Sequence, residues 1–301
     1  MRNRTFSTVL FFLLLYVSGV AFAQPLAKYP KHPSLNSCAN DRPKPLNLAL
    51  RNRDGEQVDE SRIWQFPDNT FFFIAGMTID ADGAPNAYHP DDTGIDELAN
   101  AGRPGHWDGI ITDRHGTPIV QGEADPFPGY YISCTSLADR TKEFNDPRRY
   151  VDATKIPYVA LPEEIAEGGG AQLGDFAFVV NLRNGKSSFA IYADIGAPGE
   201  GSVALAERLG IAPDARHGGE SDGVLYVFFP GSGNMQPRNN DEIQGEGERL
   251  LSDSNAIEKL SSCSQSDGGP VINSRELWLQ RRAFQSMTKP TKRRGFRMRC
   301  F

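Results

Sequence analysis

Apolar runs in the middle of the chain predict a small β-rich core. Residues 175–181 and 187–193 are rich in aromatic and β-branched residues, as strands are. The five residues between them include Asn184 and Gly185, a pair that adopts positive φ easily, so the pattern predicts a β-hairpin. A third apolar run at residues 224–229 predicts a returning strand.

A short helix is predicted between these strands. Residues 203–209 place apolar side chains on one face, Ser202 can cap the start, and Gly210 can end the helix in the left-handed conformation. The segment 195–199 ahead of it contains two glycines and a proline, which predicts a loop.

Further apolar segments extend the predicted β-structure. We expect a buried strand at residues 70–79, a second hairpin at 109–112 and 118–121, and strands at 130–134 and 156–161. Many short strands and few long helical patterns predict an α+β fold that is mostly β, with a barrel-like β core and a few short helices.

The two ends of the chain differ from its middle. Residues 1–23 carry two arginines ahead of an apolar run and end in a small-x-small site, which predicts a secretory signal peptide and export to the extracellular space or the periplasm. Residues 24–64 predict an irregular lead-in and residues 65–233 the main domain. Residues 234–301 predict a C-terminal extension with a helix at 248–260 and a basic tail.

Charge narrows the range of partners. Residues 24–280 hold 22 basic and 38 acidic side chains, whereas residues 281–301 hold eight basic and no acidic ones. The acidic body would concentrate cationic ligands and repel nucleic acid and anionic lipid. We therefore expect neither nucleic acid nor a membrane as a partner, and we interpret the basic tail as a solvated segment.

The cysteines predict disulfides rather than a metal site. Cys38, Cys134, Cys263 and Cys300 are even in number in a chain predicted to be exported, and they show no CxxC spacing. Three pairings are open, and proximity in the sequence favours Cys38 with Cys134 and Cys263 with Cys300.

Two known motifs occur in the sequence without the flanking features that their functions require. Residues 219–223 spell Gly-x-Ser-x-Gly, but a loop precedes Ser221, a predicted strand follows it, and no histidine lies beyond His217. The turn at residues 80–83 lacks the distal glutamate of a calcium-binding loop. A serine hydrolase and a calcium site are thus disfavoured, and we expect no cofactor.

Two carboxylates, Asp194 and Glu200, flank the predicted loop at 195–199. Glycoside hydrolysis needs two carboxyl groups on opposite sides of the scissile bond, one protonated and one ionised. The competing interpretation is a turn-forming Asp194 and a charge at the helix start for Glu200. Aromatic rings that could stack on sugars are Tyr88, Trp107, Tyr130 and Tyr192.

Several sequence blocks, in order, resemble one enzyme family. The blocks are residues 77–83, 129–137, 150–158, 173–176, 193–194, 199–205, 224–227 and 231–233. Together they resemble glycoside hydrolase family 75, the fungal-type endo-chitosanases and their bacterial relatives, over roughly residues 71–233. The loop between the two carboxylates is shorter than expected of the fungal members, and the basic tail lies outside the pattern.

The resemblance implies a specific reaction. It makes residues 65–233 a chitosanase-like catalytic domain, with Asp194 and Glu200 as the essential pair for inverting hydrolysis of β-1,4 linkages in chitosan, without a cofactor. The helix dipole favours Glu200 as the base, and desolvation at the end of a buried strand favours Asp194 as the acid.

A polycationic substrate agrees with the acidic body of the protein. We predict that Asp80, Asp82 and Asp108 contact the ammonium groups of chitosan, with Tyr88, Trp107 and Tyr192 as further substrate-binding residues. Two alternatives stay open: a muramidase-like or transglycosylase-like enzyme that acts on peptidoglycan, and a non-catalytic polysaccharide-binding protein. In each case we expect a monomer.

Overall fold

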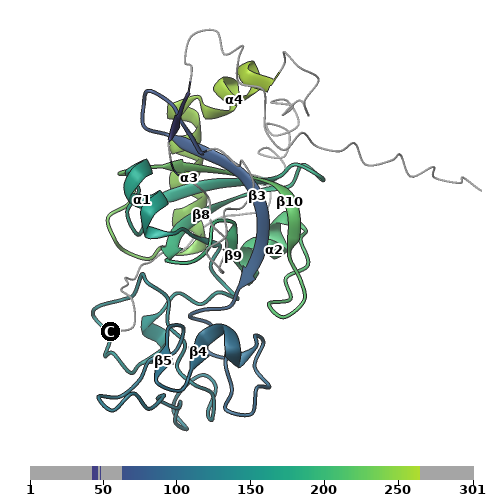
Figure 1. The fold of residues 1–301 in the computed structure, drawn as a ribbon. Coiled ribbons are helices and arrows are strands. Elements are labelled where there is room, and N and C mark those ends of the chain that lie inside the picture. The colour runs from purple at the N-terminus through teal and green to yellow at the C-terminus, as the bar shows by residue number, and fades with distance from the viewer. Residues whose placement is uncertain (1–42, 47, 49–62, 265–301) are drawn as a thin grey trace, which may run out of the picture.

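A computed structural model of the protein describes residues 43–46, 48 and 63–264 (Figure 1). The strands are β1 (Lys44–Leu46), β2 (Ile63–Gln65), β3 (Phe71–Asp80), β4 (Gly102–Arg103), β5 (His106–Trp107), β6 (Tyr158–Ala160), β7 (Phe176–Asn181), β8 (Ser187–Asp194), β9 (Glu200–Ser202) and β10 (Glu220–Phe229). The helices are α1 (Glu163–Gly169), α2 (Val203–Leu209), α3 (Asn240–Ser254) and α4 (Ala256–Ser264), with 3-10 turns η2 (Leu98–Ala101) and η3 (Pro147–Arg149).

Six of the strands close into a barrel. Around the ring the order is β3, β10, β7, β8, β6 and β9, and β9 pairs with β3 to close it. The pairs β6–β8 and β3–β9 are parallel, and the other four pairs are antiparallel. This arrangement confirms the predicted mostly β fold with a barrel-like core and short helices.

Alternating residues of the barrel strands belong to two separate hydrophobic clusters. Phe71 and Phe73 of β3 stack on Phe228 and Tyr226 of β10, with ring centroids 4.8 and 5.0 Å apart. Phe72, between them, joins the cluster that includes Ile243 of α3. Since α3 lies outside the ring, the stacked rings fill its interior, as expected for a barrel of so few strands.

The hairpin predicted at 175–181 and 187–193 is confirmed as β7 and β8, which pair in antiparallel register. The predicted helix at 203–209 is α2. The hydroxyl of Ser202 accepts a hydrogen bond from Leu205 N at 3.1 Å, and Gly210 ends the helix at φ 64°.

The C-terminal helix begins earlier than predicted. The side chain of Asn239 accepts from Glu242 N, and the Glu242 side chain accepts from Asn239 N, so this capping box starts α3 well ahead of residue 248. Asn255, at φ 49°, then separates α3 from α4. Ile243 is buried, so α3 packs on the barrel although it lies beyond residue 233.

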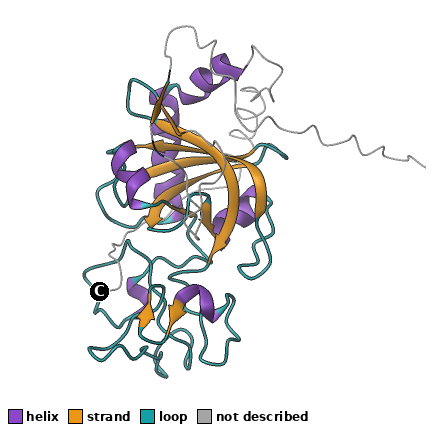
Figure 2. Cartoon of the chain, in the orientation of Figure 1, coloured by secondary structure: helices purple, strands orange, loops and turns teal. Residues whose placement is uncertain are grey.

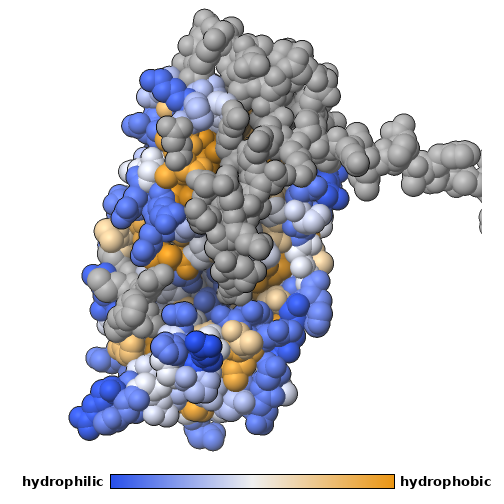
Figure 3. All heavy atoms as spheres, in the orientation of Figure 1, coloured by the Kyte–Doolittle hydropathy of each residue, from blue (hydrophilic) through white to orange (hydrophobic). Residues whose placement is uncertain are grey.

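Between β3 and β6 the chain forms loops with little regular structure beneath the barrel (Figure 2). The strands predicted at 109–112, 118–121 and 130–134 are wrong. The structure has isolated bridges there, such as Ile110 with Ser133 and Val120 with Tyr131. Glycine, proline and aspartate interrupt these short apolar runs, so no ladder extends. On the face shown in Figure 3, this part is largely hydrophilic with separate hydrophobic spots.

Several predictions concern residues outside the described ranges. They are the signal peptide, most of the lead-in, the basic tail and the side chains of Cys38, Cys263 and Cys300. Cys134 is buried in a small cluster with Ile111 and Ile132, and its pairing stays a prediction. Within the described ranges, no helix is both long and apolar enough to cross a membrane.

Candidate active site

Asp194 and Glu200 lie on the two strands that flank β6. In the sheet register, Ala160 of β6 pairs with Asp194 of β8 on one side and with Glu200 of β9 on the other. The loop 195–199 connects the two strands. Neighbouring strands lie about 4.8 Å apart, and two successive spacings meet at an angle in a closed ring, so the Cα atoms of the two acids lie roughly 8 to 10 Å apart.

Asp194 is almost buried and accepts several hydrogen bonds. Its side chain ends β8, and the residue is 7% exposed. Oδ1 accepts from Ser136 N at 2.7 Å, from the Ser136 hydroxyl, and from Ile195 N at 2.7 Å. These converging donors stabilise negative charge on the carboxylate.

Glu200 is half-buried at the start of β9. Its Oε2 accepts from Ala197 N at 2.6 Å, within the loop that leads to it. Gly196 packs directly against this carboxylate and against Ala160. Burial, followed by the charge of Glu200, raises the pKa of the interior Tyr226 well above its usual value, so this carboxylate lies within electrostatic reach of the barrel interior.

A third carboxylate, Asp82, lies within electrostatic reach of Asp194. Burial raises the pKa of Asp82 well above its usual value, and the charges of Asp80 and then Asp194 raise it further. Asp82 Oδ1 is 2.7 Å from the hydroxyl of Tyr88. Gly109 packs so closely that a Cβ there would be 2.6 Å from Asp82 Oδ1.

Asp80 ends β3 and belongs to the same group of acids. It pairs with Ser202 of β9, two positions beyond the pairing of Thr78 with Glu200. Its Oδ1 accepts from Asp82 N at 2.8 Å, so part of its role is to close the turn. In the part of the chain that the structure describes, no group of three or more His, Cys, Asp or Glu side chains is arranged to hold a metal ion.

Two of the aromatic residues predicted to bind substrate are buried. Tyr88 and Tyr192 are each 2% exposed, in the two core clusters, so neither offers a ring face to a sugar here. Tyr88 instead contacts Asp82 through its hydroxyl. Tyr130 is half-buried, and its ring meets His89 edge-on at 4.8 Å.

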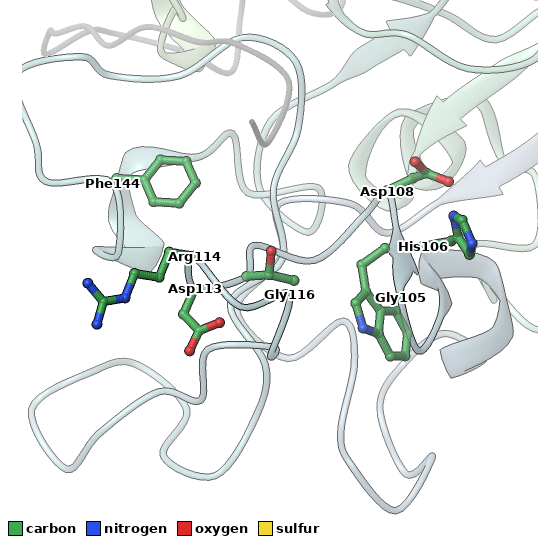
Figure 4. A pocket seen from close by; sticks show the side chains of 9 residues that line it. Gly105, His106, Asp108, Asp113, Arg114, Gly116 and Phe144 are labelled. Carbon is green, nitrogen blue, oxygen red and sulfur yellow. The ribbon is translucent and has the colours of Figure 1, made fainter.

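Trp107 and Asp108 line a separate pocket in the loops (Figure 4). The pocket has a volume of about 590 Å³, with His106 and Asp108 on one side and Arg114 and Phe144 on the other. Asp108 is exposed and Trp107 half-buried. Asp108 precedes Gly109, so the chain that lines this pocket continues into the glycine that packs against Asp82.

Sequence reasoning missed the residues that hold these acids in place. Ser136 orients Asp194, and Asp96 shares the hydroxyl of Tyr88 with Asp82. Ser136 lies in a block that carried the family resemblance, which was an available indication. Asp96 follows no recognisable pattern and becomes visible only in the fold.

One family of known proteins matches this chain. Residues 110–259 match the model described as fungal chitosanase of glycosyl hydrolase group 75. The chain belongs to glycosyl hydrolase group 75. No curated protein matches it. The group 75 match contains both Asp194 and Glu200, and it supports a chitosanase-type glycoside hydrolase with a polysaccharide substrate.

Proposed function

We propose that the protein is a secreted, monomeric endo-chitosanase that inverts the anomeric centre, with Asp194 and Glu200 as its catalytic carboxyl groups. The observation that carries the proposal is the shared register of these two acids with Ala160. One strand between two acids leaves room that adjacent strands would not.

The strand spacing supports inversion. Inverting glycosidases hold their two carboxyl groups about 6.5 to 9.5 Å apart to admit a water molecule, whereas retaining enzymes hold them about 5 to 5.5 Å apart. A separation of roughly 8 to 10 Å between the Cα atoms on β8 and β9 is compatible with carboxyl groups of the first class when the two side chains extend in the same direction.

The hydrogen bonds favour Asp194 as the base and Glu200 as the acid. Donors from Ser136 and Ile195 stabilise an ionised Asp194. This assignment is the reverse of the one predicted from the sequence, in which the helix dipole favoured Glu200 as the base. Glu200 lies in β9, two residues ahead of the cap Ser202, rather than in the first turn of α2.

In this mechanism both protons are accounted for. Asp194 takes a proton from the attacking water as its oxygen bonds to C1. Glu200 gives its proton to the glycosidic oxygen as the C1–O bond breaks. Each turnover leaves Asp194 protonated and Glu200 ionised, so exchange with solvent restores both before the next cleavage.

Substitution of each acid tests the proposal. Asp194→Asn and Glu200→Gln should each lower chitosan hydrolysis at least ~100-fold with the melting temperature preserved. Proton NMR should show the α-anomer as the first product. A loss of activity below tenfold for either variant would return that residue to a structural role.

Substrate comparison separates the alternative functions. Reducing ends should be released from chitosan and not from peptidoglycan; the opposite result would indicate a muramidase-like or transglycosylase-like enzyme. Binding to chitosan without release of reducing ends would indicate a non-catalytic polysaccharide-binding protein.

A further inference from the structure

Tyr88 lies between two carboxyl groups that its single hydroxyl hydrogen cannot both serve. Its Oη is 2.7 Å from Asp82 Oδ1 and 3.2 Å from Asp96 Oδ2. A phenol carries one hydrogen, and ionised carboxylates carry none. For both contacts to be full hydrogen bonds two hydrogens are needed, and one of the carboxyl groups then has to supply the second.

Asp96 has the environment of an ionised carboxylate. It is 4% exposed, and its Oδ1 accepts from Glu97 N and from Asn100 Nδ2, each at 2.7 Å. The guanidinium of Arg216 donates to the backbone oxygen of Asp96 at 2.9 Å and brings a positive charge to the same place. These contacts favour Asp96 as the acceptor of the Tyr88 hydrogen.

Asp82 has the environment of a neutral carboxylic acid. The hydroxyl of Ser133 donates to Gly109 O at 2.9 Å and lies 3.4 Å from Asp82 Oδ1, so its hydrogen is directed to the carbonyl oxygen and not to Asp82. The titratable groups that act on Asp82 are three acids, Asp80, Asp96 and Asp194, and the phenol of Tyr88. Burial, followed by the charges of Asp80 and Asp194 and to a smaller extent that of Asp96, raises the pKa of Asp82 well above the ordinary value, although the hydrogen bond with Tyr88 acts in the opposite direction.

We propose that Asp82 is a protonated carboxylic acid that donates to Tyr88, and that this positioning residue keeps Asp194 free of a second adjacent negative charge. The role for Asp194 rests on the proposed function, whereas the protonation does not. An ionised Asp82 would favour a proton on Asp194 and so oppose its action as a base. The proposal replaces the predicted contact of Asp82 with substrate ammonium groups.

Infrared spectroscopy of the resting protein tests the protonation directly. At pH about 6 an ordinary aspartate is ionised, so a carbonyl stretching band of a protonated carboxylic acid that Asp82→Asn removes would belong to Asp82. Tyr88→Phe should shift the frequency of that band because the acid loses its acceptor. If Asp82→Asn removes no such band, the proposal is overturned.

Kinetics tests the positioning role. Asp82→Ala adds no charge but removes the donor to Tyr88, so it should lower kcat about tenfold. Asp82→Asn should recover most of the loss, because a neutral amide also donates to Tyr88. Asp96→Asn is the matched control for the same exchange at the other carboxyl group. It replaces one accepting oxygen of Asp96 with an NH₂ donor, so it should lower the melting temperature. Equal loss for Asn and Ala at position 82 would mean that Asp82 acts as an anion and would overturn the proposal.

The two proposals fail in different ways. If Asp194→Asn hydrolyses chitosan normally, the proposed function is wrong, while the infrared band still decides whether Asp82 is protonated. If Asp82→Ala does not fold, the spectra of the wild type and of Asp82→Asn give the answer.

Discussion

Ser136 donates to the same oxygen of Asp194 twice, once from its backbone N–H and once from its hydroxyl. Ser136→Ala removes the hydroxyl and keeps the backbone donor. A hydrogen bond to a charged group contributes about 1.5 to 3 kcal/mol, so kcat should fall roughly 10- to 100-fold with little change in KM.

Ser188→Ala is the control for this variant. Ser188 is another buried serine, on β8, and its hydroxyl donates to Phe189 O at 2.9 Å rather than to an acid. Steady-state kinetics on chitosan should separate the two variants. Equal effects on kcat would mean that Ser136 stabilises the fold and has no specific effect on Asp194.

Gly196→Ala should displace Glu200. A Cβ at position 196 would come within 2.1 Å of Glu200 Oε2 and 3.1 Å of the Ala160 Cβ, so the carboxylate has to move. A catalytic group that is misplaced by about 1 Å can cost ~100-fold in rate, and we expect a loss of that order. Gly245→Ala on α3, where a Cβ meets nothing within 4 Å, should retain the wild-type rate.

Asp80→Asn should weaken substrate binding without unfolding the turn. The amide oxygen can still accept from Asp82 N, while the charge is removed. An exposed ion pair contributes about 0.2 to 1 kcal/mol, so KM should rise up to ~5-fold and depend less on salt. A lower melting temperature with unchanged salt dependence would assign Asp80 to the turn alone.

Asp82→Asn should also change how stability depends on pH. Because the pKa of Asp82 is raised in the folded protein, its stabilising contribution is complete below the unfolded value of about 3.9 and is lost as pH rises through the folded value. The Asn variant has no such loss. Its melting temperature should therefore exceed that of the wild type increasingly with pH, by about 2 °C or more at pH ~8.

Asp113→Asn provides the opposite sign in the same experiment. The backbone hydrogen bonds from Thr117 and His115 lower the pKa of Asp113, so its contribution is present above the unfolded value and is lost as pH falls. This variant should be less stable than the wild type at neutral pH, with the difference closing in acid. Parallel pH curves for the two variants would contradict at least one of the two assignments.

The sequence was most informative where the side-chain pattern and the local chemistry agreed. The hairpin of β7 and β8 has apolar strands around an Asn-Gly turn, and α2 has a serine cap and a terminal glycine. These features depend on neighbours in the chain. The positions of Asp194 and Glu200 next to a helix and a loop could be predicted for the same reason.

The sequence was least informative where the structure depends on distant residues. Residue 160 shows no feature that would indicate its place between Asp194 and Glu200, because register across strands is set by the whole barrel. Tyr88 and Tyr192 were predicted to bind sugar because they are aromatic, but core packing decided their burial. The loops beneath the barrel are held by side-chain contacts that no periodic pattern predicts.

The closed ring of six strands also limits how far the spacing of Asp194 and Glu200 could change among relatives. The gap between Asp194 and Glu200 is set by two ladders of backbone hydrogen bonds on either side of β6, and not by the loop 195–199 that connects them. Insertions in that loop would leave the gap as it is. Relatives with longer loops could therefore differ in substrate fit and keep the same separation of the two Cα atoms, and under the proposed function they would still release the same anomer.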